Sequence, residues 1–247
     1  MIILIFFLAH WYMSLFFQTF YLHRYAAHRM FTMSKTWEKI FNFSSWIFQG
    51  SSYLSGYAYG AMHRMHHAFA DTENDPHSPK YDDNIFSMMW RTKGIYHSIF
   101  KREAAIDPKF LKDLPDWHLF EKFASHKLVR LAWIAAYIAF YIAFATQWWM
   151  FLLLPLHFAM GPLHGAIINW FSHKYGYTNF KVKDTSKNFL PFDFLMMGES
   201  YHNNHHKRGT NPNFGYRWFE IDPTYITIKV LHFLKIIKLR PIAKREY

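Results

Sequence analysis

Long apolar runs, separated by polar stretches, dominate the pattern of this chain. The first extends from Met1 to Tyr21 and is almost uncharged, with the ~20 residues that a helix needs to cross the hydrocarbon core of a bilayer. It has neither a basic leader nor a small-residue cleavage site, so we interpret it as a retained spanning helix. Two further runs, from Leu131 to Gln147 and from Trp148 to about Ser172, follow one another closely and predict a helical hairpin.

A fourth apolar segment, from Trp37 to Gly60, is interrupted by polar residues, including Glu38 and Gln49. Histidines lie on both sides of it, and a single crossing would put them on opposite faces of the membrane. We therefore predict an interfacial helix or a re-entrant segment here, because a partly polar segment is tolerated at a bilayer surface or where protein covers it. The pattern as a whole predicts an all-α integral membrane protein with about three spanning helices and one domain, residues 1–247.

The distribution of charged residues predicts how the protein is oriented in the membrane. The formal net charge is +11, and Lys and Arg are abundant from Arg24 to Lys127 and from Lys174 to Arg245 but absent near Gln147. The positive-inside tendency predicts that the histidine-bearing part, a helical cap, lies on the cytoplasmic side together with any active site that it forms. The basic residues are scattered between apolar runs, which is typical of membrane flanks, and we predict no nucleic-acid partner.

The chain has 17 histidines and no cysteine, so any bound metal must be held by nitrogen and oxygen ligands. Residues at i, i+3 and i+4 share one face of a helix, so each HxxHH cluster can present at least two imidazoles in one direction. An i, i+5 pair does not, and the first cluster therefore indicates a helix end. The clusters are HxxxxH at His23 and His28, HxxHH at His63, His66 and His67, HxxHH at His202, His205 and His206, and NxxxH at Asn169 and His173.

About nine converging histidines exceed what one zinc ion can use, which indicates two metal ions. Carboxylate-bridged di-iron proteins use Glu and Glu-x-x-His on four helices, and no such pattern occurs here. An all-nitrogen site is the better interpretation. Histidines outside the clusters are expected to be packing residues; these are His10, His97, His118, His126, His157, His164 and His232.

In order and spacing, the clusters resemble those of the membrane fatty-acid desaturases of the stearoyl-CoA desaturase type. Neighbouring residues extend the resemblance: Asp71 and Asp75-Pro76-His77 follow the second cluster, and Gly198-Glu199 precedes the third. The resemblance implies two irons, with Asn169 holding one through a water. It places one iron near His66, His173, His202 and His206, and the other near His23, His28, His63, His67 and His205.

Three acidic residues lie beside these histidines in the sequence, namely Asp71, Asp75 and Glu199. Each could accept the second N–H of an imidazole ligand and so fix its tautomer and orientation. We treat them as candidate supporting residues; solvated surface acids are the competing interpretation.

The resemblance implies an enzyme that uses dioxygen to introduce a cis double bond into an acyl chain, on CoA or on a lipid. Acid–base groups cannot remove hydrogen from an unactivated methylene, so this step requires oxygen activated by a metal. The two electrons require an external donor, of the ferredoxin or cytochrome b5 type with a reductase, because the chain shows no flavin, nicotinamide or haem motif. Two alternatives stay open: a di-iron hydroxylase acting on a lipid, alkane or carotenoid, and a metal-binding or transporting membrane protein.

Overall fold

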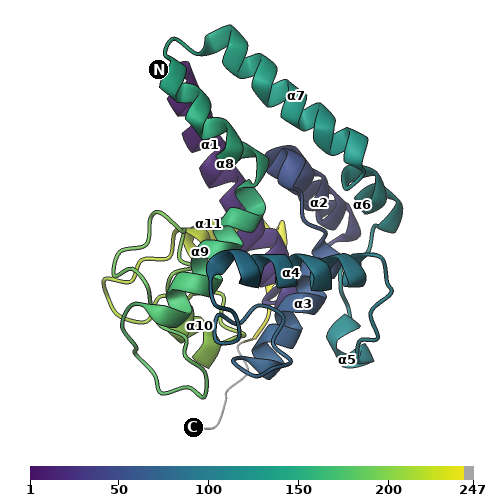
Figure 1. The fold of residues 1–247 in the computed structure, drawn as a ribbon. Helices are drawn as coiled ribbons and strands as arrows, with labels where there is room; N and C mark the ends of the chain where they lie inside the picture. The colour runs from purple at the N-terminus through teal and green to yellow at the C-terminus, as the bar shows by residue number, and fades with distance from the viewer. Residues whose placement is uncertain (242–247) are drawn as a thin grey trace.

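The computed structural model describes residues 1–241, which are mostly helical (Figure 1). Helix α1 (Ile2–Phe17) continues without interruption into the π-helix η1 (Gln18–Ala27), and together they form an apolar rod of 26 residues. Helix α7 (Lys127–Phe144) is the second helix long and apolar enough to cross a membrane. Only 11% of this apolar helix is buried against the rest of the protein, so most of its surface can contact lipid.

The third predicted span is broken. The 3-10 helix η3 (Trp148–Leu153) and α8 (Leu154–Phe158) are separated from α9 (Met160–Lys174) by a bend of 75°. Pro162 explains the break, because its ring cannot fit against the carbonyl four residues earlier in a continuous helix. The described residues thus hold two candidate spanning helices, or three if the bent pair is one span.

The segment predicted to be interfacial forms two helices, α2 (Lys35–Gln49) and α3 (Gly56–Phe69), with the 3-10 turn η2 (Gly50–Ser52) between them. Ser34 and Ser55 cap the two helices by accepting hydrogen bonds from backbone N–H groups of the first turn. Neither helix is among the candidate spans. Helix α3 packs along η1 and brings the second histidine cluster next to the first.

The remaining helices are α4 (Ile85–Phe100), α5 (Pro108–Leu111), α6 (His118–Ala124), α10 (His202–Lys207) and α11 (Pro223–Phe233). The prediction of a helical cap is only partly right, because residues 175–201 are irregular and Asn188 forms bridges with both Tyr177 and Tyr201. The prediction of an all-α chain is also wrong in one detail: β1 (Phe31–Met33) pairs antiparallel with β2 (Ile237–Leu239).

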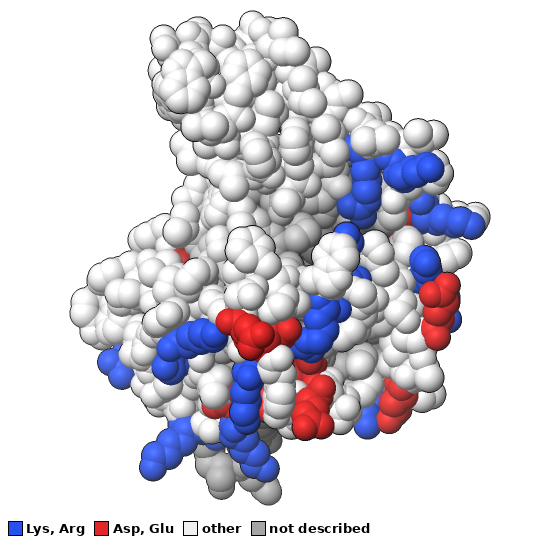
Figure 2. Space-filling model, viewed as in Figure 1, with Lys and Arg blue, Asp and Glu red and all other residues white. Residues whose placement is uncertain are grey.

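Charged side chains are confined to one part of the molecule. Figure 2 shows Lys, Arg, Asp and Glu over the broad lower body and its flank, whereas the upper part, built from α1, α7 and α8 (Figure 1), is free of charge on this face. A charge-free projection with exposed apolar side chains indicates membrane association. The main buried core lies below it, around Phe20, Tyr25 and Phe31.

Candidate metal centre

The first histidine cluster lies on the π-helix. His28 is the C-cap of η1, and its backbone N–H donates to the carbonyl of His23 at 3.1 Å, an i to i+5 bond. A π-turn holds more residues than an α-turn, so positions five apart come close together. The two rings are 5.0 Å apart between centroids. The pair does mark a helix end, but the expectation that it would not share a face assumed α-helical geometry and is wrong.

Each of the two HxxHH clusters divides its histidines between neighbouring groups. On α3, the Nε2 atoms of His63 and His67, one turn apart, are 3.0 Å from each other. His66 points instead to His206, with 3.3 Å between their Nε2 atoms. On α10 the division is reversed, because His205 joins the group of His63 and His67.

The nine clustered histidines form two adjacent groups, within each of which the candidate ligand atoms lie within 4.8 Å of one another. Each of the nine histidines directs its Nε2 atom toward the Nε2 atom of another histidine in this set. This grouping coincides with the one that the resemblance implies. The larger group is His23, His28, His63, His67 and His205, and the smaller is His66, His173, His202 and His206.

Carboxylates hold the opposite ring nitrogen of three of these histidines. Nδ1 of His23 donates to Glu199 at 2.6 Å, and Nδ1 of His66 donates to Asp75 at 2.9 Å. The third pair was not predicted: Nδ1 of His206 donates to Asp184 at 3.0 Å. These bonds fix the tautomer that leaves Nε2 free to act as a ligand.

Asp71 acts through an intermediary. Nδ1 of His173 lies 3.2 Å from the hydroxyl of Thr185, which in turn donates to Asp71 at 2.8 Å. Thr185, like Asp184, was missed in the sequence. Each follows the NxxxH motif in an irregular loop, and no local spacing connects Asp184 with His206, which lies 22 residues later.

Burial controls the charge of these groups. It lowers the pKa of His63, His67, His202 and His205 well below the ordinary value, and it lowers that of His206 to about 4. These five imidazoles are therefore neutral, the form in which they bind metals. Burial alone would raise the pKa of Asp75, but its hydrogen bonds and electrostatic interactions with His66 and His77 together outweigh burial and lower the value to about 2, so this acceptor is ionised.

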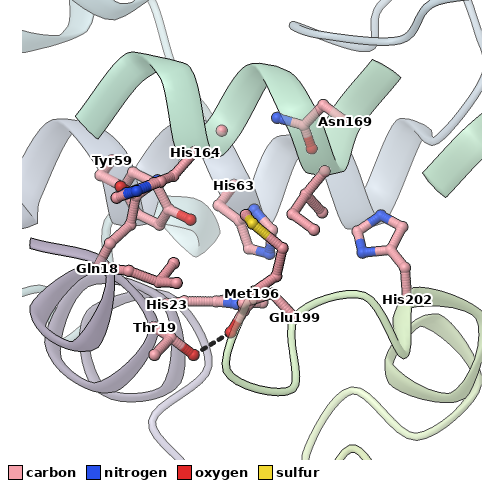
Figure 3. Close-up of a pocket in the computed structure, with 13 residues that line it drawn as sticks. Gln18, Thr19, His23, Tyr59, His63, His164, Asn169, Met196, Glu199 and His202 are labelled. Atoms are coloured by element: carbon pink, nitrogen blue, oxygen red, sulfur yellow. Dashed lines mark hydrogen bonds and ion pairs between the residues drawn. The ribbon is translucent and has the colours of Figure 1, made fainter. Parts of the chain in front are cut away.

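Two cavities adjoin the histidines. The smaller, of about 30 Å³, is lined by His23, His63 and His202 together with Asn169, which the sequence singled out (Figure 3). The larger, of about 210 Å³, lies between α3, α4 and α9. Its lining includes His63 and Asn169, and most of its wall is apolar. Its apolar and aromatic lining, which the sequence did not single out, includes Leu54, Tyr59, Met62, Met89, Tyr96 and Pro162.

The comparisons with known proteins agree on one family. Residues 1–225 match the family model for fatty acid desaturase. The chain is 33% identical over 233 residues to the sn-1 stearoyl-lipid 9-desaturase of Synechocystis sp., which covers 89% of this chain and 66% of that protein. It is 30% identical over 224 residues to the Delta-9 desaturase-like 5 protein of Arabidopsis thaliana, covering 87% and 69%. The chain thus spans about two thirds of the length of these relatives.

Proposed function

The chain belongs to the fatty acid desaturase family, and from this premise we propose that it is an oxygen-dependent fatty-acyl desaturase with a histidine-ligated di-iron centre. The observation that carries the proposal is the pair of adjacent imidazole groups, one of which meets a largely apolar cavity through His63. Neutral imidazole is a good ligand for iron, and nine Nε2 atoms suit two ions better than one.

In this proposal, the larger histidine group holds one iron and the smaller group holds the other, with Asn169 contributing through a water. When bound, the irons would activate dioxygen, the oxidant needed to remove hydrogen from an unactivated methylene. The protein's part is orientation. Glu199, Asp75 and Asp184 hold His23, His66 and His206 through their Nδ1 atoms, and Asp71 holds His173 through the Thr185 hydroxyl.

The larger cavity is the proposed acyl-chain site. Its apolar wall would hold a saturated chain away from water, and the part lined by His63 and Asn169 would place one pair of methylenes beside the irons. The substrate class is an acyl chain on a thioester or a lipid. The names of the relatives make position 9 of a stearoyl chain on a lipid the first candidate to test.

We further propose one domain with up to three spans, an interfacial α2, and a histidine-bearing cap on the cytoplasmic side. The charge-free projection in Figure 2 and the absence of Lys and Arg near Gln147 support this topology. Electrons would come from a separate ferredoxin or cytochrome b5 with its reductase.

The direct test is expression of the chain with each of these reducing systems, followed by mass spectrometry of cellular fatty acids. A new monounsaturated chain is expected, and ozonolysis would locate its double bond. Hydroxylated chains instead would assign the protein to the alternative di-iron hydroxylases. Iron-loaded protein that oxidises no acyl chain with either donor would contradict the proposal.

The Asp184→Asn variant tests the support of His206. Asn is uncharged and has an N–H group that can face Nδ1, so the ring loses its ionic acceptor and its fixed tautomer. Loss of such a partner typically lowers metal affinity or activity by ~10–100-fold. Competition with a chelator, at equal protein concentration, measures the affinity. Asp83→Asn, on the exposed surface, is the control and should match the native protein.

Gly165→Leu tests the cavity. An added Cβ at this position would meet only the Gln18 side chain, at 3.7 Å, so a larger side chain has room to enter the two cavities that Gly165 lines. The helix propensity of leucine is also more favourable than that of glycine by ~0.5–1 kcal/mol, so the fold is expected to persist. Desaturation should fall by at least ~10-fold, because a shift of the acyl chain by one methylene would move the reacting carbons away from the metal centre. Gly94→Leu, in open space on α4, is the control.

A further inference from the structure

The smaller cavity contains polar groups that the proposed ligand set does not use. His164, on α9, is buried to 1% exposure, and neither of its ring nitrogens has a hydrogen-bond partner. The carbonyl oxygen of the Gln18 side chain is also buried without a partner. Figure 3 shows both residues at the same end of the cavity, beside Tyr59, with His63 and His202 farther along it.

Unpartnered buried polar atoms carry a large free-energy penalty, of ~1–3 kcal/mol each. Packing does not account for them here: Trp11 meets the His164 ring edge-on at 4.5 Å between centroids, and that contact leaves both nitrogens unsatisfied. The cavity volume of about 30 Å³ is enough for about one water. A water needs two to four polar partners, and His164, Gln18 and Asn169 line this space.

We propose that this cavity is a water site and that His164 is a positioning residue for proton delivery to the metal centre. The inference rests on the proposed function. Desaturation balances as –CH2–CH2– + O2 + 2 e⁻ + 2 H⁺ giving –CH=CH– + 2 H2O, with both electrons from the external carrier. Two protons must therefore reach a buried site from solvent.

An imidazole suits this task because it can accept a proton at one nitrogen while releasing one from the other. His164 would pass the proton to the water, and the water would carry it to the oxygen being reduced. The three carboxylate-paired ligands, His23, His66 and His206, are unsuited, because each has Nδ1 committed to its acceptor and Nε2 to the metal. His164 is free of both commitments.

Two substitutions separate this role from packing. His164→Leu keeps the approximate volume but removes both polar atoms, whereas His164→Gln keeps a donor and an acceptor. The readout is coupling: double bonds formed and peroxide released per electron consumed, with iron content measured on the same samples. His10→Gln is the control, because His10 is also a buried histidine of the membrane helices but lines neither of the two cavities.

With normal iron content, His164→Leu is expected to form ~10-fold fewer double bonds per electron and to release peroxide; proton transfer by a positioned group is worth ~10²–10⁴-fold. His164→Gln should lose less, and His10→Gln should couple normally. Coupling in His164→Leu equal to that of the native protein would overturn the inference while leaving the desaturase proposal intact. A native protein that desaturates nothing would defeat the proposed function itself.

A second readout needs no turnover. A high-resolution structure of the metal-free native protein should show an ordered water within hydrogen-bond distance of His164, and His164→Leu should lack it. A dry cavity in the native protein would overturn the inference even if the His164→Leu variant failed to fold.

Discussion

Replacing His205 with Ala is expected to abolish double-bond formation and to reduce bound iron from two ions to about one per chain. Nε2 of His205 lies 2.9 Å from Nε2 of both His23 and His67, within the larger histidine group. Its removal takes one of five imidazole ligands from that group. Metal analysis and fatty-acid profiling of the same preparation measure both effects.

The control for this substitution is His232→Ala. His232 is exposed on α11 and belongs to neither histidine group, so iron content and product should stay at native levels. Native amounts of monounsaturated product from the His205→Ala variant would show that the larger group is not a catalytic iron site.

Replacing Arg24 with Met is expected to destabilise the protein by ~3–5 kcal/mol, the usual cost of removing one partner from a buried ion pair. Arg24 is fully buried; its guanidinium donates to Asp222 at 2.7 Å and lies 3.5 Å from Glu199. It also stacks on Phe214 at 3.8 Å. Its loss leaves two buried carboxylates without a cation, and one of them orients His23.

Thermal unfolding in detergent measures this effect. Arg102→Met is the matched control, because Arg102 pairs with Asp116 at 2.6 Å while both side chains are more than 40% exposed. Exposed pairs contribute at most ~1 kcal/mol. Equal shifts in midpoint for the two variants would show that Arg24 does not hold the carboxylates in place.

The sequence predicted those parts of the site that depend on local spacing. Helical spacing predicted that each HxxHH cluster presents at least two imidazoles in one direction, and His63 and His67, one turn apart on α3, do so. Asp75 and Glu199 were named as candidate supporting residues because each lies near a histidine box in the sequence. In the structure Asp75 accepts from Nδ1 of His66, in the box that it follows, whereas Glu199 accepts from Nδ1 of the distant His23 and not from the box that it precedes.

What the sequence did not predict depends on backbone geometry or on distant loops. The π-helical turn that joins His23 to His28 has no marker in residue type. Asp184 reaches His206 only because an irregular loop folds back over α10. The bend before α9 was also missed, although Pro162 was visible, because hydropathy over a window averages across a change of direction.

The small strand pair has a consequence for the order of events during synthesis. Phe31 pairs with Leu239, so an early and a late segment of the described residues are held together, and the histidine groups likewise combine residues as far apart as His23 and His206. Contacts so distant in sequence form late, after most of the chain has left the ribosome. If the protein binds two irons as proposed, neither histidine group has its full set of ligands before His205 and His206 have been synthesised, so we expect iron insertion to come after these residues have folded into place.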